Sequence, residues 1–189
     1  MDAEVQHAFR PTIFSRERGF RLGADTLVVD DGGNSRTIPL AQVAGIRVYK
    51  QPGAGFGPAI RRAIVRLADG ATLVVQNTHY LGFARIEDRA ASYRAFVAAL
   101  VERVVRANPD ARVTVGHSWL AWSIWLALLV AALAVLALGA ILLASRDFPL
   151  AAVLYVGIVV AFVPTMWRVV RDSRPRASDP HALPAGLLD

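Results

Sequence analysis

Apolar and polar positions alternate with a period of two through much of the first 76 residues of the chain. Short stretches of this kind occur at residues 19–22, 26–29, 35–38, 43–50, 60–67 and 72–76, and a seventh is expected at residues 9–14. The segment from Asp30 to Asn34, which reads Asp-Asp-Gly-Gly-Asn, carries the strongest turn signal between them. Short strands at regular spacing, separated by turns, indicate a small antiparallel sandwich or barrel of six or seven strands.

The apolar period lengthens to 3.6 between residues 86 and 105. One stripe of this segment is apolar and consists of Tyr93, Phe96, Val97, Leu100, Val101 and Val104. Arg94, Glu102 and Arg103 lie largely off the stripe, so the pattern predicts an amphipathic helix packed on the sheet. Glu87 and Asp88 near its start suit the helix dipole. Asn108-Pro109 ends the helix, and residues 113–116 can add one short extended piece.

Two later stretches, residues 119–144 and 148–167, contain no Asp, Glu, Lys or Arg. A helix needs about 20 apolar residues to cross a bilayer, and both stretches reach that length. Residues 145–147 are the only linker between them, so we expect two antiparallel neighbouring helices. Pro149 lies in the first turn, where a missing N–H costs little, whereas Pro164 is expected to kink or end the second helix.

These patterns predict an α+β domain followed by an all-α transmembrane hairpin. The expected parts are a flexible N-terminus at 1–8, a cytoplasmic domain at 9–116, the hairpin at 117–170, and a disordered tail at 171–189. The tail is rich in Pro, Asp and Ala, which favours disorder.

The arginines predict the orientation of the hairpin. Four of them follow the second span, at positions 168, 171, 174 and 176, against one in the turn between the spans. Cationic residues accumulate on the cytoplasmic side, so both termini are expected in the cytoplasm of a bacterium and the protein in its inner membrane, as a multi-pass protein. The residues expected to anchor the spans at the interface are Trp119, Trp122, Trp167, Arg168 and Arg171.

Composition adds a charge imbalance to this picture. Residues 1–118 carry 16 Lys and Arg against 11 Asp and Glu, and Lys50 is the sole lysine. The abundance of Arg, Ala, Val and Gly indicates a GC-rich bacterial genome. The chain has no cysteine, which excludes disulfides, thiolate metal sites and a cysteine nucleophile. No apolar run near the N-terminus is long enough for a signal peptide.

Candidate chemistry is sparse. The four histidines, at positions 7, 79, 117 and 181, show no metal-ligand spacing. Gly53-x-Gly55-x-Gly57 lacks the ending of a phosphate-binding loop, and Glu87-Asp88-Arg89 is interpreted as an ionic network at a helix start. The sequence therefore predicts a protein that is not an enzyme, with no catalytic residue, cofactor or metal. No nucleic-acid-binding motif accompanies the high pI, so attraction to membranes is the simpler interpretation of the charge.

The order of these elements resembles a known family. Six or seven antiparallel strands followed by one amphipathic helix resemble the bacterial pleckstrin-homology-like (PH-like) fold, over roughly residues 9–116. The segment from Ile38 to Ile46 resembles the usual crossing between strands in that family. The resemblance implies a bent sheet capped at one end by the helix.

A narrower resemblance involves both ends of the chain. Tyr80-Leu81-Gly82-Phe83, Glu87-Asp88-Arg89 and the segment from Ser92 to Val97 are similar to a group of uncharacterised two-helix membrane proteins of proteobacteria. The Arg- and Pro-rich tail is similar to the ending of that group. The resemblance implies no activity.

One basic segment suggests a ligand. Lys50, followed after ten residues by Arg61 and Arg62 and then by Arg66, resembles the basic loop of phosphoinositide-binding PH domains, although the adjacent arginines depart from that spacing. The leading hypothesis is a membrane-tethered interaction module that binds a protein partner or its own copies. Two alternatives remain open: a sensor of anionic lipid headgroups that uses Lys50, Arg61 and Arg62, and an accessory subunit of a larger membrane complex.

Overall fold

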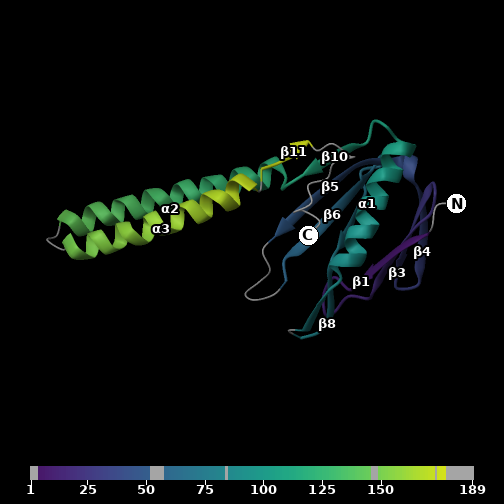
Figure 1. The fold of residues 1–189 in the computed structure, drawn as a ribbon, viewed down its shortest axis with the longest axis horizontal. Coiled ribbons are helices and arrows are strands. Elements are labelled where there is room, and N and C mark those ends of the chain that lie inside the picture. Colours follow the sequence, from purple (N-terminus) through teal and green to yellow (C-terminus); the bar gives the residue numbers. More distant parts are fainter. Residues whose placement is uncertain (1–3, 52–57, 84, 146–148, 173, 178–189) are drawn as a thin grey trace. The chain divides into compact units, whose positions relative to one another are not determined.

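The computed structural model describes residues 4–51, 58–83, 85–145, 149–172 and 174–177 (Figure 1). By contacts along the backbone the chain divides into two compact units. The first comprises Met1–Val115 and Arg176–Asp189, and the second comprises Gly116–Pro175. The fold is α+β, with mostly antiparallel sheets and one long apolar helix. Gly53, Gly55, Gly57 and His181 lie outside the described residues.

The first sheet of the N-terminal unit is a simple antiparallel meander. Its strands, in spatial order, are β1 (Val5–Phe9), β2 (Arg18–Leu22), β3 (Thr26–Asp31) and β4 (Asn34–Pro39). The tight turn between β3 and β4 has Gly32 and Gly33 at φ of 62° and 108°, a region that favours glycine. The predicted turn is thus confirmed. Residues 5–8, predicted to be flexible, instead form most of β1, because Phe9 at its end enters the core and the whole strand pairs with β2.

The second sheet is mixed and has the order β11-β10-β5-β6-β7. Its members are β5 (Val43–Gln51), β6 (Ile60–Leu67), β7 (Thr72–Gln76), β10 (Arg112–Val115) and β11 (Arg176–Ala177), and the 3-10 turn η1 (Leu40–Gln42) leads into it. Strand β10 runs parallel to β5, and the other pairs are antiparallel. A Cβ added to Gly45 would lie 2.7 Å from the carbonyl oxygen of Arg112, so the close approach of β10 to β5 requires glycine there.

Helix α1 (Ala90–Ala107; Figure 1) carries the apolar stripe that the sequence predicts. All six residues of the stripe are buried. Phe9, Phe20 and Phe96 form an aromatic core in which the first two rings stack at 5.8 Å. Arg103 was expected to lie off the stripe, but it is buried. Its Nη1 donates to the carbonyl oxygens of Leu22 and Gly23 at 3.0 and 2.7 Å. These hydrogen bonds satisfy the backbone carbonyl groups at the end of β2.

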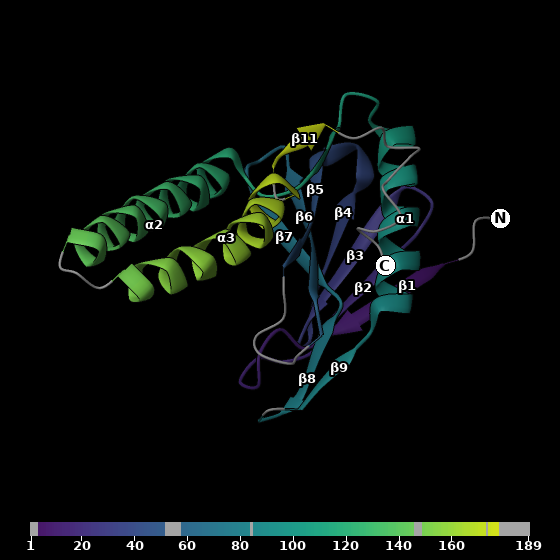
Figure 2. The same cartoon turned by 60° about the vertical axis from the view of Figure 1, so that its left-hand side comes forward.

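Between β7 and α1 the chain forms a two-stranded arm that the sequence did not predict (Figure 2). The arm consists of β8 (Thr78–Gly82) and β9 (Arg85–Asp88), which pair in antiparallel register. The expected helix start at Ile86 is therefore wrong: Ile86, Glu87 and Asp88 are strand residues, and α1 begins at Ala90. The count of six or seven strands is also too low, because nine strands precede the helix among the described residues.

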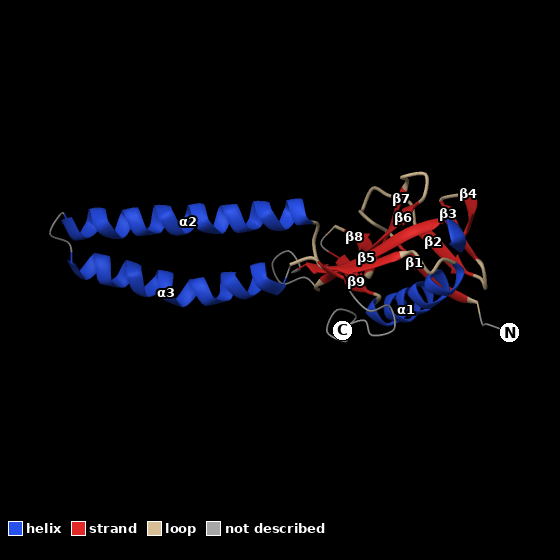
Figure 3. Ribbon diagram, turned by 90° about the horizontal axis from the view of Figure 1, so that it is seen from above, coloured by secondary structure: helices blue, strands red, loops and turns tan. Residues whose placement is uncertain are grey.

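The second unit contains α2 (Trp119–Ser145) and α3 (Pro149–Asp172), which lie side by side (Figure 3). Among the described residues, one helix, Trp119–Leu142, is long and apolar enough to cross a membrane, with a mean hydropathy of 2.8. Helix α3 continues through Pro164 rather than ending there.

The tail departs from its prediction at its start. Arg171 and Asp172 belong to α3, and Arg176–Ala177 pairs with β10, because β10 would otherwise leave its outer backbone groups unpaired. The remainder, residues 178–189, lies outside the described residues.

Candidate functional site

The root of the arm is organised by one buried amide side chain. Asn77 lies between β7 and β8 and is completely buried. Its Oδ1 accepts the backbone N–H of Arg61 at 2.7 Å, and its Nδ2 donates to the carbonyl of Ala59 at 3.0 Å and to the carboxylate of Asp88 at 2.6 Å. The backbone carbonyl of Asn77 accepts the N–H of Arg89 at 2.8 Å. Asn77 thus joins β6, both ends of the arm and the start of α1.

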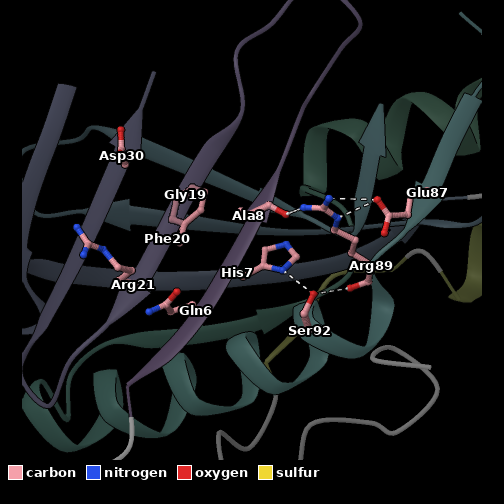
Figure 4. A pocket seen from close by; sticks show the side chains of 10 residues that line it. All are labelled: Gln6, His7, Ala8, Gly19, Phe20, Arg21, Asp30, Glu87, Arg89 and Ser92. Carbon is pink, nitrogen blue, oxygen red and sulfur yellow. Dashed lines mark hydrogen bonds and ion pairs between the residues drawn. The ribbon is translucent and has the colours of Figure 1, made fainter. Parts of the chain in front are cut away.

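A second network surrounds the guanidinium of Arg89, which directly precedes α1. It donates to the carbonyl of Ala8 at 2.8 Å and to Glu87 at 3.1 Å (Figure 4). It also donates to Glu17 at 3.2 Å. His79 Nδ1 lies 3.8 Å from the same Glu17 carboxylate. The predicted ionic network at the helix start therefore exists, but it links four segments of the chain rather than one turn of helix.

Next to this network, His7 forms a pair with Ser92 (Figure 4). Nε2 of His7 lies 2.9 Å from the carbonyl oxygen of Gln76, so it carries the proton, and the hydroxyl of Ser92 lies 3.0 Å from Nδ1. Burial lowers the pKa of His7 below its ordinary value of 6.5, and the nearby charge of Arg89 acts in the same direction. The neutral ring therefore offers Nδ1 as an acceptor to the Ser92 hydroxyl, whose single proton is shared with the carbonyl oxygen of Arg89, and this contact fastens α1 to β1.

His7, Arg89 and Ser92 border an open cleft of about 710 Å³. A serine hydrogen-bonded to a neutral histidine can act as a nucleophile, with the histidine as its general base. Here the ring is oriented by a backbone carbonyl rather than by a carboxylate, and the hydroxyl of Ser92 also lies 3.1 Å from the carbonyl of Arg89. In the described part of the chain, no three His, Asp or Glu side chains are placed to hold a metal ion. The arrangement favours a structural role.

The arm itself exposes large apolar side chains. Phe83 is 89% exposed, Leu81 51% and Ile86 36%. Exposed apolar residues grouped on one projecting element mark interaction sites, whereas single ones are ordinary. The arm is therefore a candidate contact surface with a well-anchored base.

The structure separates the four cations predicted to contact a lipid headgroup. Lys50 and Arg61 are cross-strand neighbours on β5 and β6. Arg61 is only 8% exposed and has Asp88 at 3.7 Å, at the root of the arm. Arg62 and Arg66 lie on the opposite face of β6, because successive side chains of a strand alternate between its faces. A single site built from Lys50, Arg61 and Arg62 does not form in this structure.

The predicted interface anchors fall into two groups. Trp119 and Trp122 lie at the start of α2, where their rings meet edge to face at 5.4 Å, and Nε1 of Trp122 donates to the carbonyl of Val170 at 2.9 Å. The guanidinium of Arg174, not singled out as an anchor, lies 5.8 and 6.0 Å from the two ring centres. Trp167, Arg168 and Arg171 lie on α3 with exposed side chains.

Comparison of the chain with protein-family models, curated proteins and solved structures gives no match. Asn77 and Arg89, the two residues that organise the candidate site, were missed or assigned only a local role by sequence reasoning. Their partners lie up to 81 positions away, and no local pattern marks such contacts.

Proposed function

We propose that this protein is a non-enzymatic, membrane-anchored scaffold whose cytoplasmic domain associates with a second copy of the chain through the β8–β9 arm. The observation that carries this proposal is the sequence Arg85-Ile86-Glu87 on β9. Within the described chain β9 pairs with β8 alone, so its other edge has backbone groups without strand partners. Such an edge is a template for pairing with another strand.

The sequence of β9 is complementary to itself. If two copies of β9 pair in antiparallel orientation about Ile86, Ile86 faces Ile86 of the other copy. Arg85 of each copy then faces Glu87 of the other, which forms two opposite-charge cross-strand pairs. All three side chains are exposed in the single chain. An interface that meets itself across a two-fold axis is the commonest arrangement in protein oligomers.

The membrane anchor supports this proposal by raising the local concentration of copies. A contact through the four-residue strand β9 is expected to be small beside the roughly 800 Å² per partner of a stable interface. Confinement of both copies to one membrane makes such a weak contact sufficient, as linking does for two binding modules. In this proposal α2 and α3 are both transmembrane spans, and the arginines at the end of α3 support a position of the domain in the bacterial cytoplasm.

The proposed domain is PH-like. Two antiparallel meanders, β1-β2-β3-β4 and β5-β6-β7, followed by an amphipathic helix, support this assignment. The arm is inserted between the second meander and the helix. The carboxylates of Glu87 and Asp88 favour a protein partner for the arm over an anionic bilayer, which would repel them.

Cysteine cross-linking tests the proposal, because the full chain contains no cysteine of its own. Two Cα atoms directly opposite in an antiparallel pair lie about 4.5–5.5 Å apart, within disulfide range. We expect Ile86→Cys in native membranes to form a disulfide dimer under mild oxidation, and Ser35→Cys, on an exposed position of β4, to stay monomeric.

Exchange of the charges at positions 85 and 87 supplies a second part of this test. Arg85→Glu in the Ile86→Cys chain should reduce the dimer at least about fivefold, since like charges then face each other. Adding Glu87→Arg should restore it. Equal cross-linking in all these chains, or at Ile86 and Ser35 alike, would refute self-association through β9. Cross-linking of Ile86 to another protein alone would replace the second copy by that protein.

A further inference from the structure

The two sheets of the N-terminal unit differ in charge. The five strands of the second sheet contain seven cationic residues and no Asp or Glu: Arg47, Lys50, Arg61, Arg62, Arg66, Arg112 and Arg176. The four strands of the first sheet contain three arginines and two aspartates. The positive charge of the domain is therefore concentrated on one sheet.

Four of these cations share the outer face of the second sheet. Burial alternates along β5 and β6, with Ile46, Val48, Ala63 and Val65 in the core, so Arg47, Arg62 and Arg66 point away from it. Arg47 is paired with Ile64, which places it diagonally between Arg62 and Arg66. Arg112 of β10 lies beside Gly45, whose other neighbour is Arg66. We name Arg47, Arg62, Arg66 and Arg112 the arginine face.

The charges of the arginine face are not neutralised by the described part of the chain. On the first sheet, Arg18 pairs with Asp31 at 3.1 Å and Arg36 pairs with Asp69 at 3.6 Å. No described carboxylate pairs with a member of the arginine face, and the buried Nε of Arg62 has no acceptor among the described residues. Like charges at diagonal positions of neighbouring strands remain within reach of each other when the side chains are long, so these arginines repel one another. An external anion would offset this repulsion.

The short connections to the two long helices indicate where such an anion could come from. Strand β10 ends at Val115 and α2 begins at Trp119, while α3 ends at Asp172 and β11 begins at Arg176. Each connection consists of three residues and spans at most about 15 Å. If α2 and α3 are membrane spans, as proposed above, the two strands at the edge of this sheet are held close to the headgroups of a bilayer.

We propose that the arginine face binds the anionic phospholipid headgroups of the membrane that anchors the chain. Arginine suits this role, because its planar guanidinium donates two parallel hydrogen bonds to a phosphate group. Ile64 lies half-buried between Arg62 and Arg66, with half-buried Val74 beside it on β7, and provides an apolar surface for the aliphatic stems of the arginines. The proposal rests on membrane anchoring but is independent of the pairing of β9.

Arginine-specific labelling with phenylglyoxal tests the wild-type chain directly. The full chain would be compared in nanodiscs of phosphatidylcholine alone and in nanodiscs that contain phosphatidylglycerol. We expect Arg47, Arg66 and Arg112 to react roughly fivefold more slowly in the anionic discs. Arg21 and Arg36 on the first sheet serve as internal controls and should react at equal rates in both.

A matched pair of double variants tests the same surface by proximity. A fluorophore on Thr72→Cys, beside Arg66, would be quenched by spin-labelled headgroups in anionic discs, and 0.5 M salt would abolish the quenching. In the labelled chain, Arg47→Gln with Arg66→Gln should weaken binding of the arginine face to the headgroups, read from the quenching, roughly fivefold per arginine removed. Arg21→Gln with Arg36→Gln removes the same charge and should leave it unchanged.

Three results would overturn the headgroup assignment: equal labelling in both kinds of disc, equal quenching in both double variants, or the same protection by inorganic phosphate in detergent. Failure of the chain to enter nanodiscs would instead refute the membrane anchor. Loss of the Ile86→Cys dimer with headgroup protection intact would refute self-association alone.

Discussion

The arm and the arginine face are two exposed surfaces of one domain, and they are supported in different ways. The arm consists of two strands with little core behind them, and it is held at its root by the hydrogen bonds of Asn77 and the ion pairs of Arg89. The arginine face belongs to a five-stranded sheet whose inner side lines the hydrophobic core. A substitution at the root of the arm should therefore cause local unfolding of the arm, whereas a substitution in β5 should lower the stability of the whole domain.

The largest effect should follow loss of the Asn77 side chain. Asn77→Ala leaves the N–H of Arg61, the carbonyl of Ala59 and the carboxylate of Asp88 without their partner. Each buried group left unsatisfied costs about 1–3 kcal/mol, so the Arg61 N–H and the Ala59 carbonyl together predict a loss of about 2–6 kcal/mol. The Asp88 carboxylate is exposed and lies beside Arg61, so it adds little. Hydrogen exchange followed by mass spectrometry should show fast exchange in residues 78–88.

Asn34→Ala is the matched control, since Asn34 is exposed at the start of β4. It should leave exchange in the arm unchanged. If Asn77→Ala accelerated exchange equally in the arm and in β5–β6, the arm would not be a separate local unit, and the contrast between the two surfaces would fail.

A smaller but more widespread effect should come from Gly45→Ala. The new Cβ would lie 2.7 Å from the carbonyl oxygen of Arg112, so β10 must shift away from β5. Such overpacking costs about 1–3 kcal/mol and should lower the thermal midpoint of the full chain in mild detergent. Labelling of Arg112 by phenylglyoxal should increase at the same time.

Gly82→Ala makes the same chemical change on the arm, where an added Cβ has no heavy atom within 4 Å. Its thermal midpoint should match that of the wild type. Equal destabilisation by both changes would show that the second sheet is no more tightly packed than the arm.

The smallest effect concerns pH and the root of the arm. The pKa of His7 is lowered by burial, so the folded chain resists protonation while the unfolded chain binds a proton near the ordinary pKa of 6.5. Stability is fully present above pH 6.5 and falls as the pH drops below it. His79, whose pKa burial also lowers, acts in the same direction.

We expect the thermal midpoint in mild detergent to fall between pH 7.5 and pH 5.5, and His7→Gln to reduce that fall. An unchanged pH dependence in His7→Gln would show that His7 does not contribute. Exchange in β8 and β9 should rise more at pH 5.5, relative to the intrinsic rate, than exchange in β5 and β6.

Much of the framework could be predicted from the sequence, because the determinants are local. The apolar stripe of α1 and the strands at 43–50, 60–67 and 72–76 follow from side-chain period, and the turn at Gly32-Gly33 follows from its residues. The arm was assigned wrongly because Ile86 continues the helical period of α1. The cross-strand pairing of Thr78 with Asp88 prevailed over that local preference.

The sequence by itself predicted an apolar segment at residues 119–144, which the structure confirms as one long apolar helix, and it determined that the preceding domain is basic. Tertiary structure alone decided which face of the sheet each basic residue occupies. Arg61 and Arg62 are adjacent in the chain, yet Arg61 is buried beside Asp88 and Arg62 joins the arginine face. Hydropathy and charge are properties of a segment, whereas the face a side chain occupies depends on partners brought from distant parts of the chain by packing of the core.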